Sequence, residues 1–166
     1  MPQTITCVEL FADNWERVRD IRLQSLLESP HAFGGTYENE KLFDQLQWRN
    51  EFGKLSFIVA SIDGVDSGLM SVEILEGDFG STCWIGGCWT DPKFRGVGLM
   101  RTMFNFLDHH AIERGWQVQG LGVWTDNDSA IAAYENLGFL EMGGAQPSSR
   151  QPGKFYQRMI RKTANS

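Results

Sequence analysis

Two glycines, Gly96 and Gly98, form the most chemically informative pattern in the sequence. They follow an apolar stretch that begins at Cys83, and they precede an amphipathic segment that ends at Gly115. A strand that enters a helix through such a turn leaves the first N–H groups of the helix without carbonyl partners, and the helix dipole attracts negative charge there. The pattern therefore predicts a binding site for a phosphorylated ligand.

Two common nucleotide-binding motifs do not fit this stretch. A Walker A loop requires Gly-x-x-x-x-Gly-Lys-Ser/Thr, and no such string occurs in the sequence. A dinucleotide fingerprint requires a third glycine where this sequence has Arg101, and no βαβ unit with an acidic ribose ligand follows. We therefore expect a different mode of phosphate binding.

Length and composition favour one globular domain. The chain has 166 residues, of which 42% are hydrophobic and 22% charged, which is enough to bury a substantial core. We therefore expect a single domain over residues 1–166. The net charge of −6 argues against nucleic acid and anionic membranes as partners. An amine-bearing substrate would suit this charge, although acidity that serves solubility alone explains it equally well.

The cysteines predict neither a disulfide nor a metal centre. Cys83 and Cys88 have an odd offset within one apolar segment, which places their side chains on opposite faces of a strand. No histidine lies at ligand spacing near them. Reduced cysteines, a start without a signal-peptide pattern and no apolar run long enough to span a bilayer together predict a cytoplasmic protein.

Hydrophobic periodicity and turn residues predict strands and helices along the whole chain. Strands are expected over residues 5–10, 55–62, 69–75, the stretch from Cys83, 118–125, 139–143 and 154–161. Helices are expected over residues 14–28, 37–50, the segment up to Gly115 and 127–137, and a loop over 144–153. Hairpins mixed with crossover helices predict an α/β protein with a mixed sheet and helices on both faces.

Two stretches resemble motifs of one protein family. Residues 91–98, Asp-Pro-Lys-Phe-Arg-Gly-Val-Gly, resemble the acyl-CoA loop of the GNAT-type N-acetyltransferases, Arg/Gln-x-x-Gly-x-Gly/Ala at a helix start. Residues 127–139 resemble the second motif of that family, Asn-x-x-Ala-x-x-x-Tyr-Glu-x-x-Gly-Phe. The resemblance implies the GNAT fold, a mostly antiparallel mixed sheet of about seven strands with a splayed central pair.

The resemblance also implies an acetyl-CoA-dependent N-acetyltransferase that transfers its acetyl group directly to a primary amine. Backbone N–H groups from Gly96 to Met100 would hold the pyrophosphate of acetyl-CoA. The preceding strand would leave its neighbour at a bulge, so that the backbone of Cys88 and Thr90 pairs with pantetheine. The residues expected at the cofactor are Cys88, Trp89, Thr90, Arg95, Gly96, Val97, Gly98, Leu99, Met100, Arg101, Asn127, Ala130 and Tyr134.

Tyr134 matches the family residue that donates a proton to the departing CoA thiolate. A thiol with a pKa of ~8.5 leaves more readily when a tyrosine with a pKa of ~10 lies within hydrogen-bonding reach. The alternative is a Tyr134 that only packs its helix on the sheet. Met100 stands where the family has a small residue, and its thioether could crowd one phosphate and shift the helix start, although its backbone N–H can still donate.

The acceptor amine must lose a proton before it attacks, because an ammonium with a pKa of ~10.4 has no lone pair. Glu73, in the middle of the strand before Cys83, is the candidate general base, acting directly or through water. A solvated sheet residue is the alternative interpretation. The strand from Cys83 carries no acid, so the motif itself does not identify the base. Cys88 is not expected to carry the acetyl group.

Residues 31–40 resemble a stretch between the first two helices of some bacterial members of the family, where the acceptor pocket is built. Phe33, Tyr37, Glu38 and Glu40 are the expected acceptor-binding residues. Ordinary helix-start charges near a dipole explain the acids equally well.

Two functions from different classes fit this sequence. The first is the transferase, acting on a small-molecule amine. The second is a CoA-binding sensor or interaction module without activity, which Met100 and the missing acid motivate. Polyamines, aminoglycosides, amino acids, small toxins and protein N-termini all stay open as acceptors, and a homodimer through edge pairing of the last strands is also possible.

Overall fold

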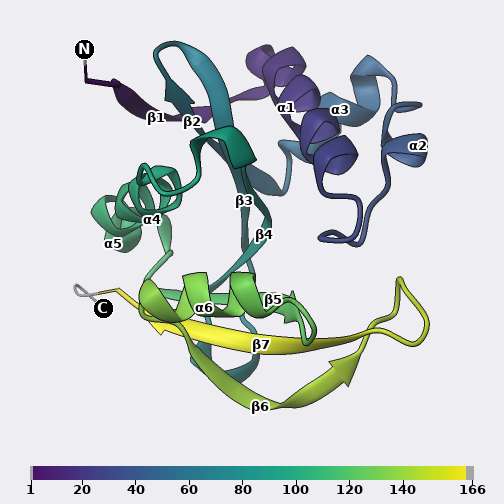
Figure 1. Ribbon diagram of the computed structural model, residues 1–166, viewed down its shortest axis with the longest axis vertical. Coiled ribbons are helices and arrows are strands. Elements are labelled where there is room, and N and C mark those ends of the chain that lie inside the picture. Colours follow the sequence, from purple (N-terminus) through teal and green to yellow (C-terminus); the bar gives the residue numbers. More distant parts are fainter. Residues whose placement is uncertain (1, 164–166) are drawn as a thin grey trace.

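The computed structural model describes residues 2–163, which form a seven-stranded sheet with helices on both faces (Figure 1). The strand order is β1-β2-β3-β4-β5-β7-β6, in which β4 and β5 pair in parallel and the other neighbours are antiparallel. The strands are β1 Ile5–Leu10, β2 Leu55–Ile62, β3 Val65–Ile74, β4 Cys83–Thr90, β5 Val118–Trp124, β6 Leu140–Pro147 and β7 Phe155–Lys162. The predicted α/β class with a mixed, mostly antiparallel sheet is confirmed.

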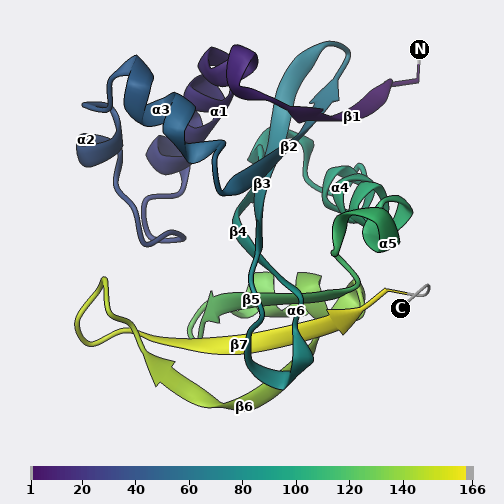
Figure 2. The same ribbon diagram turned by 180° about the vertical axis from the view of Figure 1, so that it is seen from behind.

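The helices lie on both sides of the sheet, with α1, α2 and α3 on one side of β3 and β4 and α4 and α5 on the other (Figures 1 and 2). The α-helices are α1 Trp15–Glu28, α2 Tyr37–Glu40, α3 Gln45–Glu51, α4 Leu99–His109, α5 Ala111–Arg114 and α6 Asp128–Asn136. Short 3-10 turns occupy Ala12–Asn14, Asp78–Gly80 and Pro92–Phe94. Within residues 2–163, no helix has the length and apolar character needed to cross a membrane.

Strand β2 is buried on both faces. Its side chains alternate between the two faces of the sheet, and a helix covers each face. Phe57 and Val59 face helix α1, and Ile58 and Ala60 face helix α4. Phe57 is 7% exposed, and the other three are fully buried. Helices cover both faces, which explains why the centre of this strand, residues 57–60, is apolar at every position.

Two predicted helices are interrupted. The helix expected over residues 37–50 is divided into α2 and α3, because Asp44 and Gln47 form a capping box that starts a new helix. The Asp44 carboxylate accepts a hydrogen bond from Gln47 N, and the Gln47 side chain accepts one from Asp44 N, both at 2.8 Å. The segment up to Gly115 is likewise divided at His110 into α4 and α5.

Two predicted strands are longer than expected. Strand β3 begins at Val65 because Asp63 and Gly64, with φ values of 49° and 84°, complete a two-residue hairpin turn. Strand β6 continues to Pro147, into a segment expected to be a loop. Its pairing with β7 is irregular around Gly143, where φ is 72°.

A β-bulge in β4 changes which face its side chains meet. The register with β3 shifts so that Gly87 and Cys88 together oppose one residue, and Gly87 adopts a left-handed φ of 55°. The extra residue resets the alternation, so Cys83 and Cys88 pack against the same apolar cluster, the one that contains α4. The expectation that they point to opposite faces is therefore wrong, and both thiols are free.

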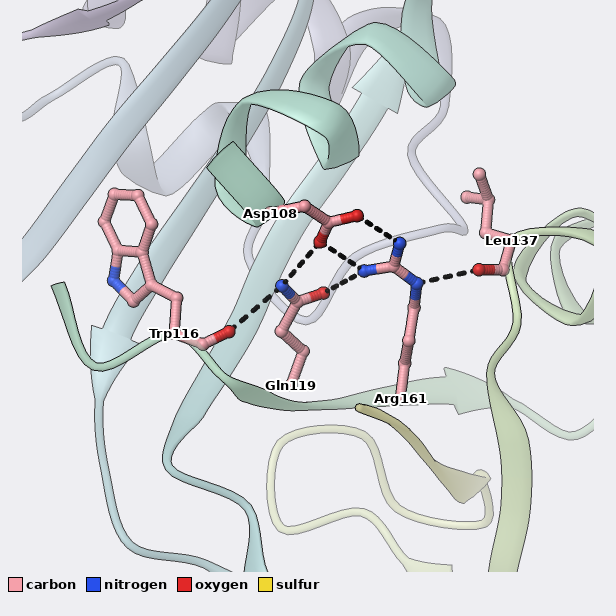
Figure 3. A network of polar contacts seen from close by, with 5 residues as sticks. All are labelled: Asp108, Trp116, Gln119, Leu137 and Arg161. Atoms are coloured by element: carbon pink, nitrogen blue, oxygen red, sulfur yellow. Dashed lines mark hydrogen bonds and ion pairs between the residues drawn. The ribbon is translucent and has the colours of Figure 1, made fainter. Parts of the chain in front are cut away.

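A polar network ties helix α4 to β5, β7 and the end of α6 (Figure 3). The Arg161 guanidinium donates to both carboxylate oxygens of Asp108, at 2.7 and 2.5 Å, and to Leu137 O at 2.7 Å. The fully buried Gln119 accepts from Arg161 at 3.0 Å and donates to Trp116 O at 3.2 Å. These contacts fix α4 relative to the sheet, and therefore fix where its first turn lies.

Replacing Arg161 with leucine should lower the free energy of unfolding by about 3 kcal/mol, because Asp108 then keeps a partly buried charge without its partner. Urea denaturation followed by tryptophan fluorescence measures this loss. Arg19→Leu is the control, because Arg19 pairs with the exposed Asp20 and such surface pairs contribute at most about 1 kcal/mol. Equal losses in the two variants would contradict the role assigned to the network.

Candidate active site

Strands β4 and β5 separate at the centre of the sheet. They pair over residues 83–85 and 119–121, although β4 continues to Thr90 and β5 to Trp124. The gap opens a cavity of about 420 Å³. Its lining includes Trp84 and Cys88 of β4, Gly122 and Val123 of β5, and Asn127, Ala130 and Tyr134 at helix α6. We call this space the donor cavity.

Helix α4 begins with its first N–H groups open. Gly96 and Gly98 have φ values of 86° and 95°, which other residues avoid, and both face open space where a Cβ would stand. Among the described residues, the first N–H of this helix with a backbone carbonyl partner is that of Thr102, which donates to Gly98 O at 2.9 Å. The N–H groups of residues 99–101 are therefore available to an anion.

The side chains beside this turn leave its backbone accessible. Met100 is half-buried and packs against the apolar cluster that contains α4, as does the fully buried Leu99. The crowding of a phosphate by Met100 stays a prediction, and the packing of its side chain against this cluster argues against it. Val97 and Arg101 are exposed, and the Arg95 side chain is 57% exposed.

The end of β4 is anchored by buried polar contacts. Trp89 packs under α1, and its Nε1 donates to Glu28 at 2.8 Å. Asp91 is 6% exposed; its carboxylate accepts from Lys93 N at 3.0 Å, and its own N–H donates to Ser67 O at 2.8 Å. The Trp89 side chain therefore serves the fold, and only its backbone is left for a ligand in the gap.

Tyr134 and Cys88 meet in the donor cavity. Tyr134 is 8% exposed, and both residues line this cavity. Burial, and to a smaller extent the neighbouring Cys88, raises the pKa of Tyr134 well above its ordinary value of 10.0. Burial also raises the pKa of the Cys88 thiol to about 12. Both groups therefore keep their protons at neutral pH.

Asn127 starts the helix that carries Tyr134. Its side-chain oxygen accepts a hydrogen bond from Ala130 N at 3.3 Å and another from the Ser129 hydroxyl at 3.3 Å. Both Asn127 and Ala130 line the donor cavity. The cap also has a structural role, because it sets where α6 begins and so where Tyr134 enters the gap.

A second cavity, of about 490 Å³, lies on the α1 face of the sheet. Ser71 and Glu73 of β3 line it, together with residues from the connection between α1 and α3. We call it the acceptor cavity. Gly34, Gly87 and Arg150 line both cavities, so the two spaces adjoin at the bulge of β4.

The structure does not bring together the four residues expected at the acceptor. Glu40 lines the acceptor cavity, but Arg22 donates to both of its carboxylate oxygens, at 2.9 and 3.0 Å. Phe33 is buried under α1 and lines the donor cavity instead. Tyr37 lines a separate surface depression beside α1, and the exposed Glu38 lines neither cavity.

Four charged residues at the acceptor cavity were not anticipated from the sequence. They are Arg22, Glu51, Lys54 and Arg150. Arg22 comes from α1, Glu51 is the last residue of α3, Lys54 lies in the connection from α3 to β2, and Arg150 lies in the connection between β6 and β7. No local spacing relates these positions, so no motif could have identified them.

The glycine pair Gly34-Gly35 is the one local signal of this arrangement. A Cβ on Gly34 would lie 2.8 Å from Arg150 Cδ, and one on Gly35 would lie 2.1 Å from Glu40 Oε2. The loop is therefore packed between these two side chains, and a larger residue at either position would require one of them to move. In the sequence the pair indicates only a loop. In the structure it also lies against two side chains at the acceptor cavity, those of Arg150 and Glu40.

Comparison with known proteins identifies the family. The model of the acetyltransferase (GNAT) family matches residues 15–139. The chain belongs to the GNAT family. A GNAT acetyltransferase from Streptococcus pneumoniae superposes with a TM-score of 0.77 at 12% identity, over 97% of this chain and 100% of that one. The yncA protein of Salmonella typhimurium, solved with its cofactor acetyl-CoA, gives a TM-score of 0.72 at 17% identity, over 96% and 94%.

A ribosomal-protein-alanine N-acetyltransferase from Brucella melitensis is also similar, with a TM-score of 0.67 at 21% identity, over 95% of this chain and 99% of that one. At these identities the likeness establishes the GNAT fold. The structural relatives therefore support the architecture around the two cavities and leave the acceptor open.

The cysteines of this GNAT protein should react slowly with alkylating reagents. Burial raises the pKa of Cys83 and Cys88 from an ordinary 9.0 to about 12, and that of Cys7 to about 11. Since the thiolate is the reactive form, native protein at pH 8 should react with iodoacetamide at least about 100-fold more slowly than urea-unfolded protein. Mass spectrometry measures the rate, and rapid modification of Cys88 in the native protein would contradict the raised pKa of its thiol.

Proposed function

We propose that this protein is an acetyl-CoA-dependent N-acetyltransferase that acetylates a primary amine on a small molecule by direct attack. The observation that carries the proposal is the junction of the donor and acceptor cavities at the bulge of β4, where both share Gly34, Gly87 and Arg150. A donor in one cavity and an amine in the other would meet at this point, already oriented for reaction.

The residues around the separated strands fit acetyl-CoA. The open N–H groups of residues 99–101, together with Gly96 and Gly98, suit a pyrophosphate. The part of β4 beyond residue 85 no longer pairs with β5, so its backbone is free to bind pantetheine as an added strand would. Bound in this way, acetyl-CoA supplies an acetyl group activated as a thioester. A backbone N–H at the bulge is a candidate donor to the thioester carbonyl.

Glu73 and Tyr134 handle protons on opposite sides of the junction. Glu73 lines the acceptor cavity and would take the proton of the ammonium group through water. Tyr134 lines the donor cavity and holds its proton, so it can donate to the departing thiolate. Cys88 lies in the same cavity, but its pKa of about 12 disfavours a route in which it carries the acetyl group.

Calorimetric titration with acetyl-CoA and CoA, followed by a thiol-release assay over a panel of amines, tests this function. We expect saturable binding and release of CoA with at least one amine. Binding without release on any amine would favour the alternative, a CoA-binding module of the same fold. Lack of binding at millimolar acetyl-CoA would contradict both functions.

Gly98→Ala should weaken acetyl-CoA binding at least about tenfold, because alanine avoids a φ of 95° and would reshape the first turn of α4. Gly64→Ala is a matched control, since Gly64 has a φ of 84°, also faces open space and lies in the β2–β3 hairpin. Calorimetry should show a changed Kd for Gly98→Ala alone. Similar Kd values for the two variants would contradict binding at the α4 turn.

Tyr134→Phe should lower kcat at least about 100-fold with little change in the KM for acetyl-CoA, because it removes a proton donor and keeps the ring. The ring should still pack against Phe139, whose centroid lies 5.7 Å away, so the thermal midpoint should change little. Burial raises the pKa of Tyr134 well above 10.0, so the hydroxyl keeps its proton as the pH rises to 10. In the unmodified protein, kcat should therefore show no loss from ionisation of Tyr134 below pH 10. An unchanged kcat would remove Tyr134 from the proton transfer.

A further inference from the structure

We infer that the acceptor is a free α-amino acid, whose carboxylate is bound by Arg150 while its amine lies at the bulge of β4. This inference rests on the proposed function and names the substrate class of the same site. The observations that support it are the charges that line the acceptor cavity and the place of Arg150 among them.

The acceptor cavity carries unpaired charges of both signs. Glu51, Lys54, Glu73 and Arg150 line it, and their side chains form no ion pair or hydrogen bond with any residue that the structure describes. Arg22 and Glu40, by contrast, neutralise each other. The lining therefore offers two free cations, both of them exposed, and two free carboxylates, which complement a ligand that itself carries both charges.

Arg150 stands at the junction of the two cavities. Its stem packs on Gly34, where a Cβ would lie 2.8 Å from Arg150 Cδ and 3.3 Å from Nη1. The neighbouring Gln151 donates to Phe33 O at 2.9 Å, which holds the β6–β7 connection against the loop after α1. A cation at the junction is next to the point where the amine must react. It therefore selects a carboxylate close to that amine, which is the arrangement of an α-amino acid.

Strand β3 supplies the proton acceptor at a suitable distance. Leu69, Ser71 and Glu73 point to the same face of the sheet and line the acceptor cavity. Ser71 donates to Gly86 O at 3.1 Å beside the bulge, and Glu73 lies about 7 Å further along the strand. This separation suits proton transfer through water from an amine at the bulge. The remaining walls are largely apolar and suit an amino-acid side chain: Phe43, Trp48, Leu55 and Phe57.

Other amine classes match these charges less well. A polyamine or an aminoglycoside could pair with Glu51 and Glu73, but its further positive charges would lie against Arg150 and Lys54, and like charges repel. A protein N-terminus has an amide where an amino acid has a carboxylate, so Arg150 would gain no charged partner. Among these classes, the free amino acid alone offers an anion to Arg150 and an amine to the bulge in one small molecule.

The test compares each standard L-amino acid with its carboxamide in the thiol-release assay. Spermidine, kanamycin and a tripeptide with a free N-terminus represent the other amine classes. The amino acids are also titrated calorimetrically into protein saturated with CoA, which measures recognition without turnover. The variants are Arg150→Gln and, as the matched control, Arg19→Gln, an arginine on α1 that lines neither cavity.

We expect the best amino acid to have a kcat/KM at least about tenfold above that of its carboxamide, as loss of a charged hydrogen bond implies. Arg150→Gln should abolish this preference by lowering the kcat/KM for the amino acid to about that for its carboxamide, while Arg19→Gln should change nothing. Selective, Arg150-dependent binding of amino acids to the CoA complex without thiol release would support the inference and contradict the proposed transfer.

Three results would overturn the inference. The first is equal or better use of the carboxamides, the tripeptide, spermidine or kanamycin. The second is a preference for the free acid that persists in Arg150→Gln. The third is that no amino acid binds to the CoA complex, whether or not another amine releases thiol.

Discussion

The separation of β4 from β5 is the constraint on which the rest of the structure depends. Neighbouring strands normally keep their backbone N–H and C=O groups paired, and here that pairing stops after residues 85 and 121. The bulge at Gly87 turns β4 away, while β5 stays paired with β7 as far as Trp124. The free backbone of β4 and the open first turn of α4 can then be satisfied by one ligand. The network around Arg161 ties α4, β7 and the end of α6 together at the level where β4 and β5 are still paired.

The parts of the fold that could be predicted are those with local signals. Alternating or continuous apolar residues identified the strands, and the turn at Gly98 identified the start of α4. The helix expected over residues 37–50 failed because the capping box at Asp44 outweighs the apolar spacing around it. The opposite faces expected for Cys83 and Cys88 failed because alternation holds only while strands stay in register, and a bulge adds one residue.

The donor side of the candidate site was easier to predict than the acceptor side. Residues 95–101 and 127–134 each belong to one continuous motif. Residues of the second motif line the cavity between β4 and β5, and the first motif follows the end of β4 and starts α4. The acceptor cavity instead takes Arg22 and Arg150 from segments far apart in the sequence, which meet only through tertiary packing. The same packing pairs Arg22 with Glu40, so a carboxylate expected to bind an amine is already neutralised. Spacing along the chain carries no information about such partners.

Hydrogen–deuterium exchange with and without acetyl-CoA can establish whether the separated strand and the start of α4 hold one ligand. In the free protein, the amides of residues 99–101 lack carbonyl partners and should exchange quickly. Saturating acetyl-CoA should slow these amides together with those of residues 87–90, and should leave the β2–β3 hairpin at Gly64 unchanged. Protection of only one of the two segments, or of neither at a concentration that saturates binding, would contradict a site formed by the separated strand and the α4 turn.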